Sequence, residues 1–131
     1  MGRNMNGGAM RTVAVMQPTY MPWIGYFDLI DQADIFVLYD DVDFSKQSWQ
    51  QRNRIKTAAG IQWLTVPVLW KGKSGQKIQD VQINPRSNDL SKHIKTIEQA
   101  YSKAPFHKAY LGDLSKLLSH RHSFLAELNI A

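Results

Sequence analysis

Two continuous apolar runs near the start of the chain predict a pair of parallel strands. Residues 12–16 (TVAVM) and 35–39 (IFVLY) are rich in strand-forming residues and lack the polar alternation of a half-exposed strand. Between them, apolar residues recur at helical spacing over residues 26–33, which predicts a short amphipathic helix that begins near Gly25. A strand, a helix and a strand over roughly 30 residues predict a right-handed βαβ unit.

The remaining pattern adds two strands and two helices. Residues 63–68 (WLTVPV) predict a third strand, and the apolar positions within residues 78–83 favour a further short one. Residues 90–101 carry one apolar helical face, and Pro105 stops that helix. Regularly spaced leucines predict a last helix from about Tyr110.

This order of elements predicts an α/β fold, with a Rossmann-like, parallel or mostly parallel sheet flanked by helices. Residues 10–131 are expected to form a single domain. Residues 1–9 hold three glycines and two asparagines without apolar periodicity, so they are expected to form a flexible tail. The apolar pattern of the last helix continues to Ala131 without a glycine cap or a proline stop, so a C-terminal part is expected to be missing.

Composition and charge limit the classes of function. No stretch has the roughly 18 uncharged apolar residues of a membrane span, and the N-terminus has no secretory signal, so a cytoplasmic protein is expected. The absence of cysteine excludes disulfides and thiolate metal sites. A net charge of +5 favours anionic partners such as nucleotides, nucleic acid or acidic glycans, although the same charge also suits a solubilising surface. No pattern indicates an oligomeric state.

The loop after the first predicted strand, QPTYMPWIGY, is the first candidate binding site. At the carboxyl end of a parallel strand, backbone amides at the start of the next helix suit a phosphate or carboxylate, and the aromatic rings could stack on a base or sugar. The alternative is that these rings are core anchors. The predicted binding residues of this loop are Gln17, Tyr20, Trp23, Gly25 and Tyr26.

Asp40 and Asp41 follow the second predicted strand, on the same sheet edge as that loop, and are the predicted catalytic carboxylates. One of them could bind Mg²⁺ or ribose hydroxyls, because neighbouring residues in an extended chain point to opposite faces. Capping of a turn is the alternative. His93 is a further candidate acid or base. His120 and His122, two positions apart, should diverge on a helix and form no metal pair.

A basic segment within residues 44–56 is the third candidate. Arginine can hold phosphate or carboxylate through two hydrogen bonds, and a tryptophan in the segment could stack on the ligand. A solvated basic face is the alternative. The predicted binding residues are Lys46, Trp49, Arg52, Asn53, Arg54 and Lys56, and the loop lysines that could close over the same anion are Lys71, Lys73 and Lys77.

Six successive blocks resemble the WbqC-like family of bacteria: MQPTYMPWIGYF, ADIFVLYDDVDFSKQSW, RNRIKT, WLTVPV, KGKSGQ and SKHIKTIEQAYSKAP. The resemblance extends from about Met10 to His107. It implies a protein associated with O-antigen and other surface-polysaccharide gene clusters, with transfer of an amino acid such as glycine onto a sugar. Family members usually extend well beyond the position of Ala131.

Particular residues qualify the resemblance. Asp43 and Gln51 replace the glutamine and the asparagine that the family usually has at these positions, which puts substrate specificity in doubt. The W-x-G-Y sequence is also arranged like the H-x-G-H motif of nucleotidyltransferases, with Trp23 and Tyr26 in place of the histidines. Because tryptophan cannot accept a proton, adenylyl transfer through this motif is not expected.

The sequence thus favours a transferase that binds an anionic donor: a nucleotide, a nucleotide sugar or an activated amino acid. A nucleic-acid-binding module is the alternative, because basic residues alternate with tryptophan and tyrosine. A truncated, non-catalytic remnant is a third possibility. No cofactor is indicated beyond Mg²⁺.

Overall fold

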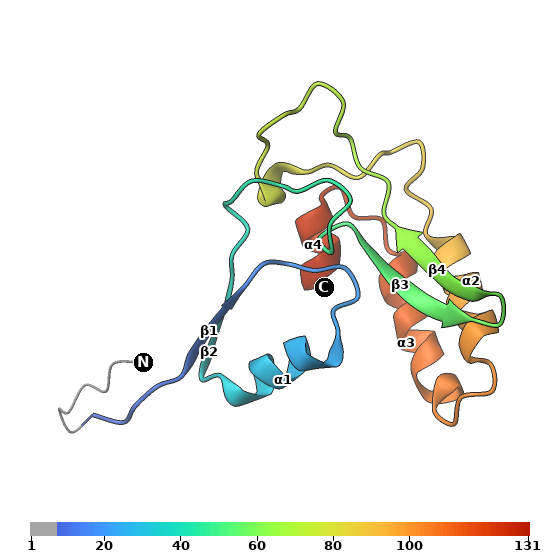
Figure 1. Ribbon diagram of the computed structural model, residues 1–131, viewed down its shortest axis with the longest axis horizontal. Coiled ribbons are helices and arrows are strands. Elements are labelled where there is room, and N and C mark those ends of the chain that lie inside the picture. Colours follow the sequence, from blue (N-terminus) through green and yellow to red (C-terminus); the bar gives the residue numbers. More distant parts are fainter. Residues whose placement is uncertain (1–7) are drawn as a thin grey trace.

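The βαβ unit predicted at the start of the chain is present in the computed structural model, which describes residues 8–131 (Figure 1). Strands β1 (Val13–Met16) and β2 (Ile35–Leu38) pair in parallel, with Val13 opposite Ile35, and helix α1 (Ile24–Gln32) connects them. The predicted tail, residues 1–9, lies mostly outside the described residues.

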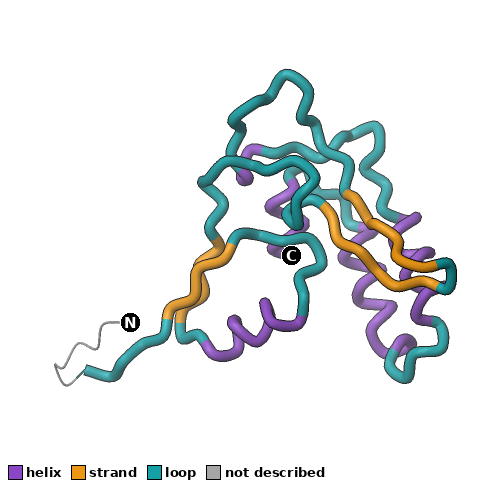
Figure 2. Tube along the Cα trace, viewed as in Figure 1, coloured by secondary structure: helices purple, strands orange, loops and turns teal. Residues whose placement is uncertain are grey.

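A second sheet, whose strands do not pair with those of the first, is an antiparallel hairpin (Figure 2). It consists of β3 (Arg52–Thr57) and β4 (Gly60–Thr65), and Gly60 has the positive φ of 111° that the tight turn requires. The sequence did not reveal β3 because its alternating cations resemble a solvated loop. The α/β class is confirmed, but residues 8–131 form two two-stranded sheets and no wider Rossmann-like sheet.

The strand predicted within residues 78–83 is wrong. Residues Ile78–Asp80 form a short 3₁₀ helix, η1, and Ile83 pairs with Val68 in an isolated bridge. The apolar residues of this segment are nevertheless buried, because they pack into the core from an irregular backbone. The apolar pattern therefore predicted burial correctly and the backbone conformation incorrectly.

Three helices complete the chain: α2 (Ser91–Tyr101), α3 (His107–Ser119) and α4 (Leu125–Ile130). The helix predicted before Pro105 is confirmed as α2. The helix predicted from Tyr110 is two helices, because His120 adopts an extended conformation and ends α3. The carboxylate of Glu127 then accepts hydrogen bonds from the backbone N–H groups of Ser123 and Phe124, which caps the start of α4.

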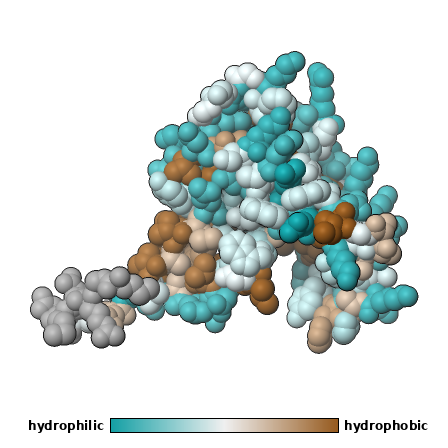
Figure 3. Space-filling view, viewed as in Figure 1, coloured by the Kyte–Doolittle hydropathy of each residue, from teal (hydrophilic) through white to brown (hydrophobic). Residues whose placement is uncertain are grey.

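The core lies between the hairpin, the 66–83 segment and helices α2 to α4. The β1–β2 pair lies at the periphery: Val13 and Val15 are more than half exposed, and brown hydrophobic side chains gather over this pair in Figure 3. None of the helices within residues 8–131 is long and apolar enough to cross a bilayer. The core cluster comprises Tyr20, Leu64, Val66, Val68, Val81, Ile83, Leu90, Ile97, Leu118, Leu125 and Leu128.

Candidate functional site

Hydrogen bonds join the loop after β1 to the segment before β3. The backbone N–H of Tyr20 donates to the carbonyl of Trp49 at 3.0 Å, and Nε2 of Gln50 donates to Oε1 of Gln17 at 2.8 Å. Nδ2 of Asn53 donates to the carbonyl of Met21 at 2.6 Å and lies 3.3 Å from that of Tyr20. These two segments lie about 30 residues apart, and the sequence predicted them as separate candidate binding sites. In the structure they form one hydrogen-bonded unit.

Between these segments lies a hollow that we call the tryptophan cleft. Its larger part has a volume of about 470 Å³, and an adjoining part of about 380 Å³ shares Thr19, Trp23 and Trp49 with it. Trp23 and Trp49 are about half exposed, which leaves indole surface free to contact a ligand. The cleft is lined by Val15, Met16, Gln17, Thr19, Trp23, Tyr39, Ser45, Ser48, Trp49, Gln50 and Asn53.

Gly25 leaves room for the Trp23 indole. A Cβ atom at Gly25 would collide with Nε1 of Trp23, so the missing side chain is what allows the indole to lie against the first turn of α1. The sequence predicted Gly25 as one of the residues of an anion-binding loop. In the structure, the Trp23 indole lies against this glycine.

Two residues of the joined segments have left-handed backbone conformations. Met21 has a φ of 47° and Gln47 a φ of 59°, and these are the two non-glycine residues with positive φ among residues 8–131. Such conformations are costly for residues with a Cβ atom, so surrounding bonds must hold them. Asn53 binds the Met21 carbonyl, and Oε1 of Gln51 accepts a hydrogen bond from the Gln47 N–H at 3.0 Å.

The predicted cations lie beside the cleft and do not line it. The Arg54 guanidinium is 5.9 Å from the ring centroid of Trp49, a residue of the cleft wall. Arg52 lies over Trp63 at 4.3 Å, and Nζ of Lys46 lies over Trp70 at 3.0 Å. Lys56 is exposed at the far end of β3.

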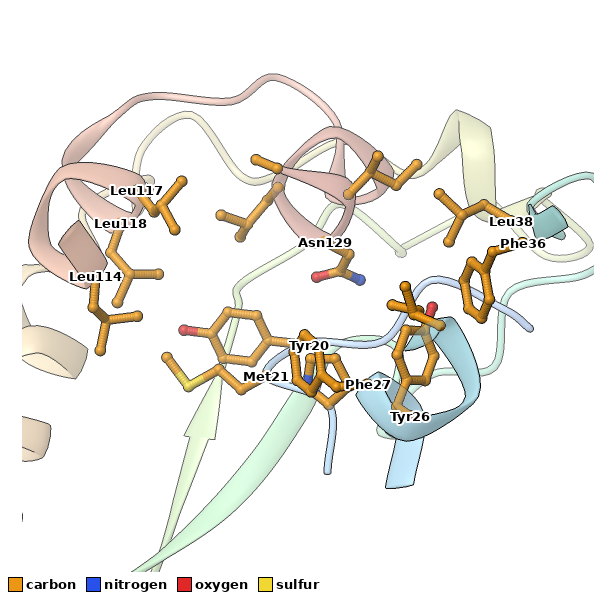
Figure 4. A pocket seen from close by; sticks show the side chains of 15 residues that line it. Tyr20, Met21, Tyr26, Phe27, Phe36, Leu38, Leu114, Leu117, Leu118 and Asn129 are labelled. Carbon is orange, nitrogen blue, oxygen red and sulfur yellow. The ribbon is translucent and has the colours of Figure 1, made fainter. Parts of the chain in front are cut away.

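Tyr20 and Tyr26 are buried and line a different cavity of about 360 Å³ (Figure 4). Its other walls are apolar side chains of the loop after β1 and of α1, β2, α3 and α4, together with the polar side chain of Asn129. The Tyr26 hydroxyl donates to the carbonyl of Gln17 at 3.1 Å, and burial raises the pKa of both phenols. For these two rings, the alternative interpretation as core anchors agrees with their burial.

The predicted catalytic residues are not brought together. Asp40 lines a separate hollow with Gln79, His120 and His122, and Asp41 is exposed. His93 is half-buried, its Nδ1 lies 2.7 Å from the Tyr20 hydroxyl, and burial lowers its pKa.

The expected divergence of His120 and His122 is wrong. Their ring centroids are 4.7 Å apart, because α3 ends at Ser119 and both residues lie beyond the helix. In the part of the chain that the structure describes, no three histidine, aspartate or glutamate side chains gather as a metal-binding group.

The sequence model of the WbqC-like protein family matches residues 17–131. The chain belongs to this family. It is 45% identical over 123 residues to the uncharacterized protein Rv1507c of Mycobacterium tuberculosis, an alignment that covers 92% of this chain and 52% of the relative. The chain therefore spans about half the length of that relative. No solved structure matches it.

Sequence reasoning missed the neutral polar wall of the cleft in this WbqC-like protein. Thr19, Ser45, Ser48 and Gln50 carry no charge and no motif that would single them out. It also missed Trp63, which the hairpin register places opposite Arg54. Recognition of residues 52–57 as a strand would have revealed this pair, because cross-strand neighbours follow from the register.

Proposed function

We propose that this WbqC-like protein is a cytoplasmic transferase of surface-polysaccharide biosynthesis, and that the tryptophan cleft binds its anionic, activated donor. The donor is a nucleotide, a nucleotide sugar or an activated amino acid such as glycine. The observation that carries the proposal is the position of Trp23 and Trp49 on one cleft, with the Arg54 guanidinium 5.9 Å from the Trp49 ring. Indoles suit a planar base or a sugar ring, and a guanidinium suits a phosphate or carboxylate.

The lining of the cleft favours binding and orientation. Apart from Tyr39, its polar side chains are amides and hydroxyls, which can bond to sugar hydroxyls or base edges without changing charge. Asp41 is exposed two residues after Tyr39, so we keep it as the proposed catalytic or Mg²⁺-binding carboxylate. The assignments of Asp40 and His93 as catalytic residues stay predictions.

We also propose that β1, α1 and β2 are the first unit of a Rossmann-like sheet in longer family members. Support comes from the exposure of Val13, Val15, Ile35 and Val37, which a two-stranded parallel sheet leaves uncovered. The mycobacterial relative has about twice the matched length, which is enough chain for further strands and covering helices.

Calorimetric titration with nucleotides, nucleotide sugars and glycine tests the donor site. We expect wild-type protein to bind at least one of these ligands, and Trp49→Ala to weaken that binding about tenfold because a stacking surface is removed. Tyr110→Ala is the matched control, since it removes an exposed aromatic ring outside the cleft. Equal binding by Trp49→Ala and wild type, or no binding to any ligand of the panel, would refute the proposal.

A further inference from the structure

Positive charge is concentrated in one continuous part of the sequence. Residues 44–79 contain none of the eleven carboxylates of the chain. In the region that the structure describes, the single ion pair joins Lys116 to Asp113, so no cation of this segment has a carboxylate within 4.0 Å. Unneutralised cations raise the local concentration of anions. The segment contains seven cations: Lys46, Arg52, Arg54, Lys56, Lys71, Lys73 and Lys77.

The β3–β4 hairpin presents three of these cations on one face, which we call the basic hairpin face. Alternate residues of a strand point the same way, so Arg52, Arg54 and Lys56 share the face opposite the one that buries Leu64. Trp63 pairs with Arg54 in the register and lies on the same face, and the residue is 43% exposed. This face therefore combines cations with an accessible indole.

The basic hairpin face continues to the rim of the tryptophan cleft. The Trp63 and Trp49 ring centroids are 5.7 Å apart with a tilt of 36°, and the Arg54 guanidinium lies within about 6 Å of both rings. Trp49 belongs to the wall of the cleft, so its indole joins the two surfaces. A ligand longer than a mononucleotide can contact both.

We propose that the basic hairpin face binds a single-stranded polynucleotide. Cations that follow a backbone and aromatic platforms that stack on successive bases are the two features that single-strand binding requires. A duplex keeps its bases stacked inside, so it cannot use the indoles. This activity goes beyond the proposed donor site and does not depend on it.

An acidic glycan fits the same face less well. Sugar hydroxyls are best held by hydrogen-bond acceptors as well as donors, and segment 44–79 has no carboxylate to supply charged acceptors. Phosphates require donors alone, which arginine, lysine and the indole N–H provide. The absence of acidic residues therefore favours the polynucleotide.

Fluorescence anisotropy with labelled oligo-U and oligo-dT of about 12 nucleotides tests the proposal. We expect tighter binding to the single strands than to a duplex of the same length or to heparin. The double variant Arg54→Gln/Lys56→Gln should weaken binding and reduce the salt slope by about 1.4, or about 0.7 for each phosphate that is no longer neutralised. Trp63→Ala should weaken binding about tenfold with little change in the salt slope, whereas Trp63→Phe should retain most of it.

The control is Lys103→Gln/Lys108→Gln, which removes the same charge from exposed positions outside the hairpin. If this variant weakened binding as much as Arg54→Gln/Lys56→Gln, binding would reflect net charge and the proposed face would be wrong. Heparin or duplex binding as tight as single-strand binding, or no binding at about 50 mM salt, would also overturn the proposal. The donor proposal is tested separately, by titration of mononucleotides and other small donors into wild type and Trp49→Ala, and none of the outcomes above decides it, so the two proposals fail separately.

Discussion

The hydroxyl of Tyr20 lies 2.7 Å from Nδ1 of His93, a residue 73 positions later in the chain. Tyr20 belongs to the loop that forms one wall of the tryptophan cleft, and His93 belongs to α2. Burial favours the neutral imidazole. The pair thus attaches the loop to the helical layer.

Removal of the Tyr20 hydroxyl should destabilise the protein. Tyr20→Phe leaves Nδ1 of His93 without its partner in a partly buried place, which costs about 1–3 kcal/mol in the free energy of unfolding. Urea denaturation monitored by circular dichroism measures this change. Tyr110→Phe, at a 67% exposed position, is the control and should change stability little. Equal stability of Tyr20→Phe and wild type would show that the hydrogen bond contributes nothing.

Stability should depend on pH through His93. Its pKa in the folded protein is lowered by burial, whereas an unfolded histidine has a pKa of about 6.5. Between these two values the unfolded state binds more protons, so the free energy of unfolding falls as pH drops below about 6.5 and levels off below the folded pKa. Urea midpoints measured from pH 8 to 5 should show a smaller fall in His93→Gln than in wild type.

His120→Gln is the control for this pH series, because His120 is exposed and makes no hydrogen bond to Tyr20. It should keep the wild-type decline. An unchanged decline in His93→Gln would assign the pH dependence to other groups.

Gly25→Ala should displace the Trp23 indole at little cost to folding. The added methyl group collides with the side chain of Trp23, which is 54% exposed and can swing away. If the tryptophan cleft binds a ligand, the affinity of any ligand found by calorimetry should fall. Gly112→Ala meets no atom within 4 Å and should leave affinity unchanged, with about 0.5–1 kcal/mol more stability from the better helix former. A fall in affinity in both variants would show that the loss of affinity does not come from displacement of the Trp23 indole.

Gln47→Gly should stabilise the protein. Gln47 is exposed at a φ of 59°, where a glycine avoids the steric cost of a Cβ atom, and its N–H bond to Gln51 is retained. We expect a gain of about 0.5–1 kcal/mol in thermal or urea unfolding. Gln62→Gly, at an exposed strand position, should destabilise by a similar amount. A lower stability in Gln47→Gly would mean that the Gln47 side chain stabilises the turn.

Local patterns in the sequence were sufficient for the parts of the fold that depend on neighbouring residues. The apolar runs at residues 12–16 and 35–39 and the helical spacing between them determined β1, α1 and β2, because β-branched residues favour an extended backbone and the apolar face of a helix repeats with the period of the helix. The motif blocks identified the WbqC-like family for the same reason, since short stretches of side chains carry the resemblance. They also nominated Trp23 and Trp49 as binding residues.

The tertiary structure decided which of the predicted site residues lie close together. Residues 52–57 became a strand only through pairing with residues 60–65, and no local apolar pattern marks that pairing. Tyr20 and Trp23 are three positions apart, yet one is buried against His93 and the other lines the cleft, because the backbone turns at Met21 and Asn53 holds that turn from another element. Interactions of this kind join residues that are distant in sequence, so the sequence could propose a binding segment but not the cleft that it forms.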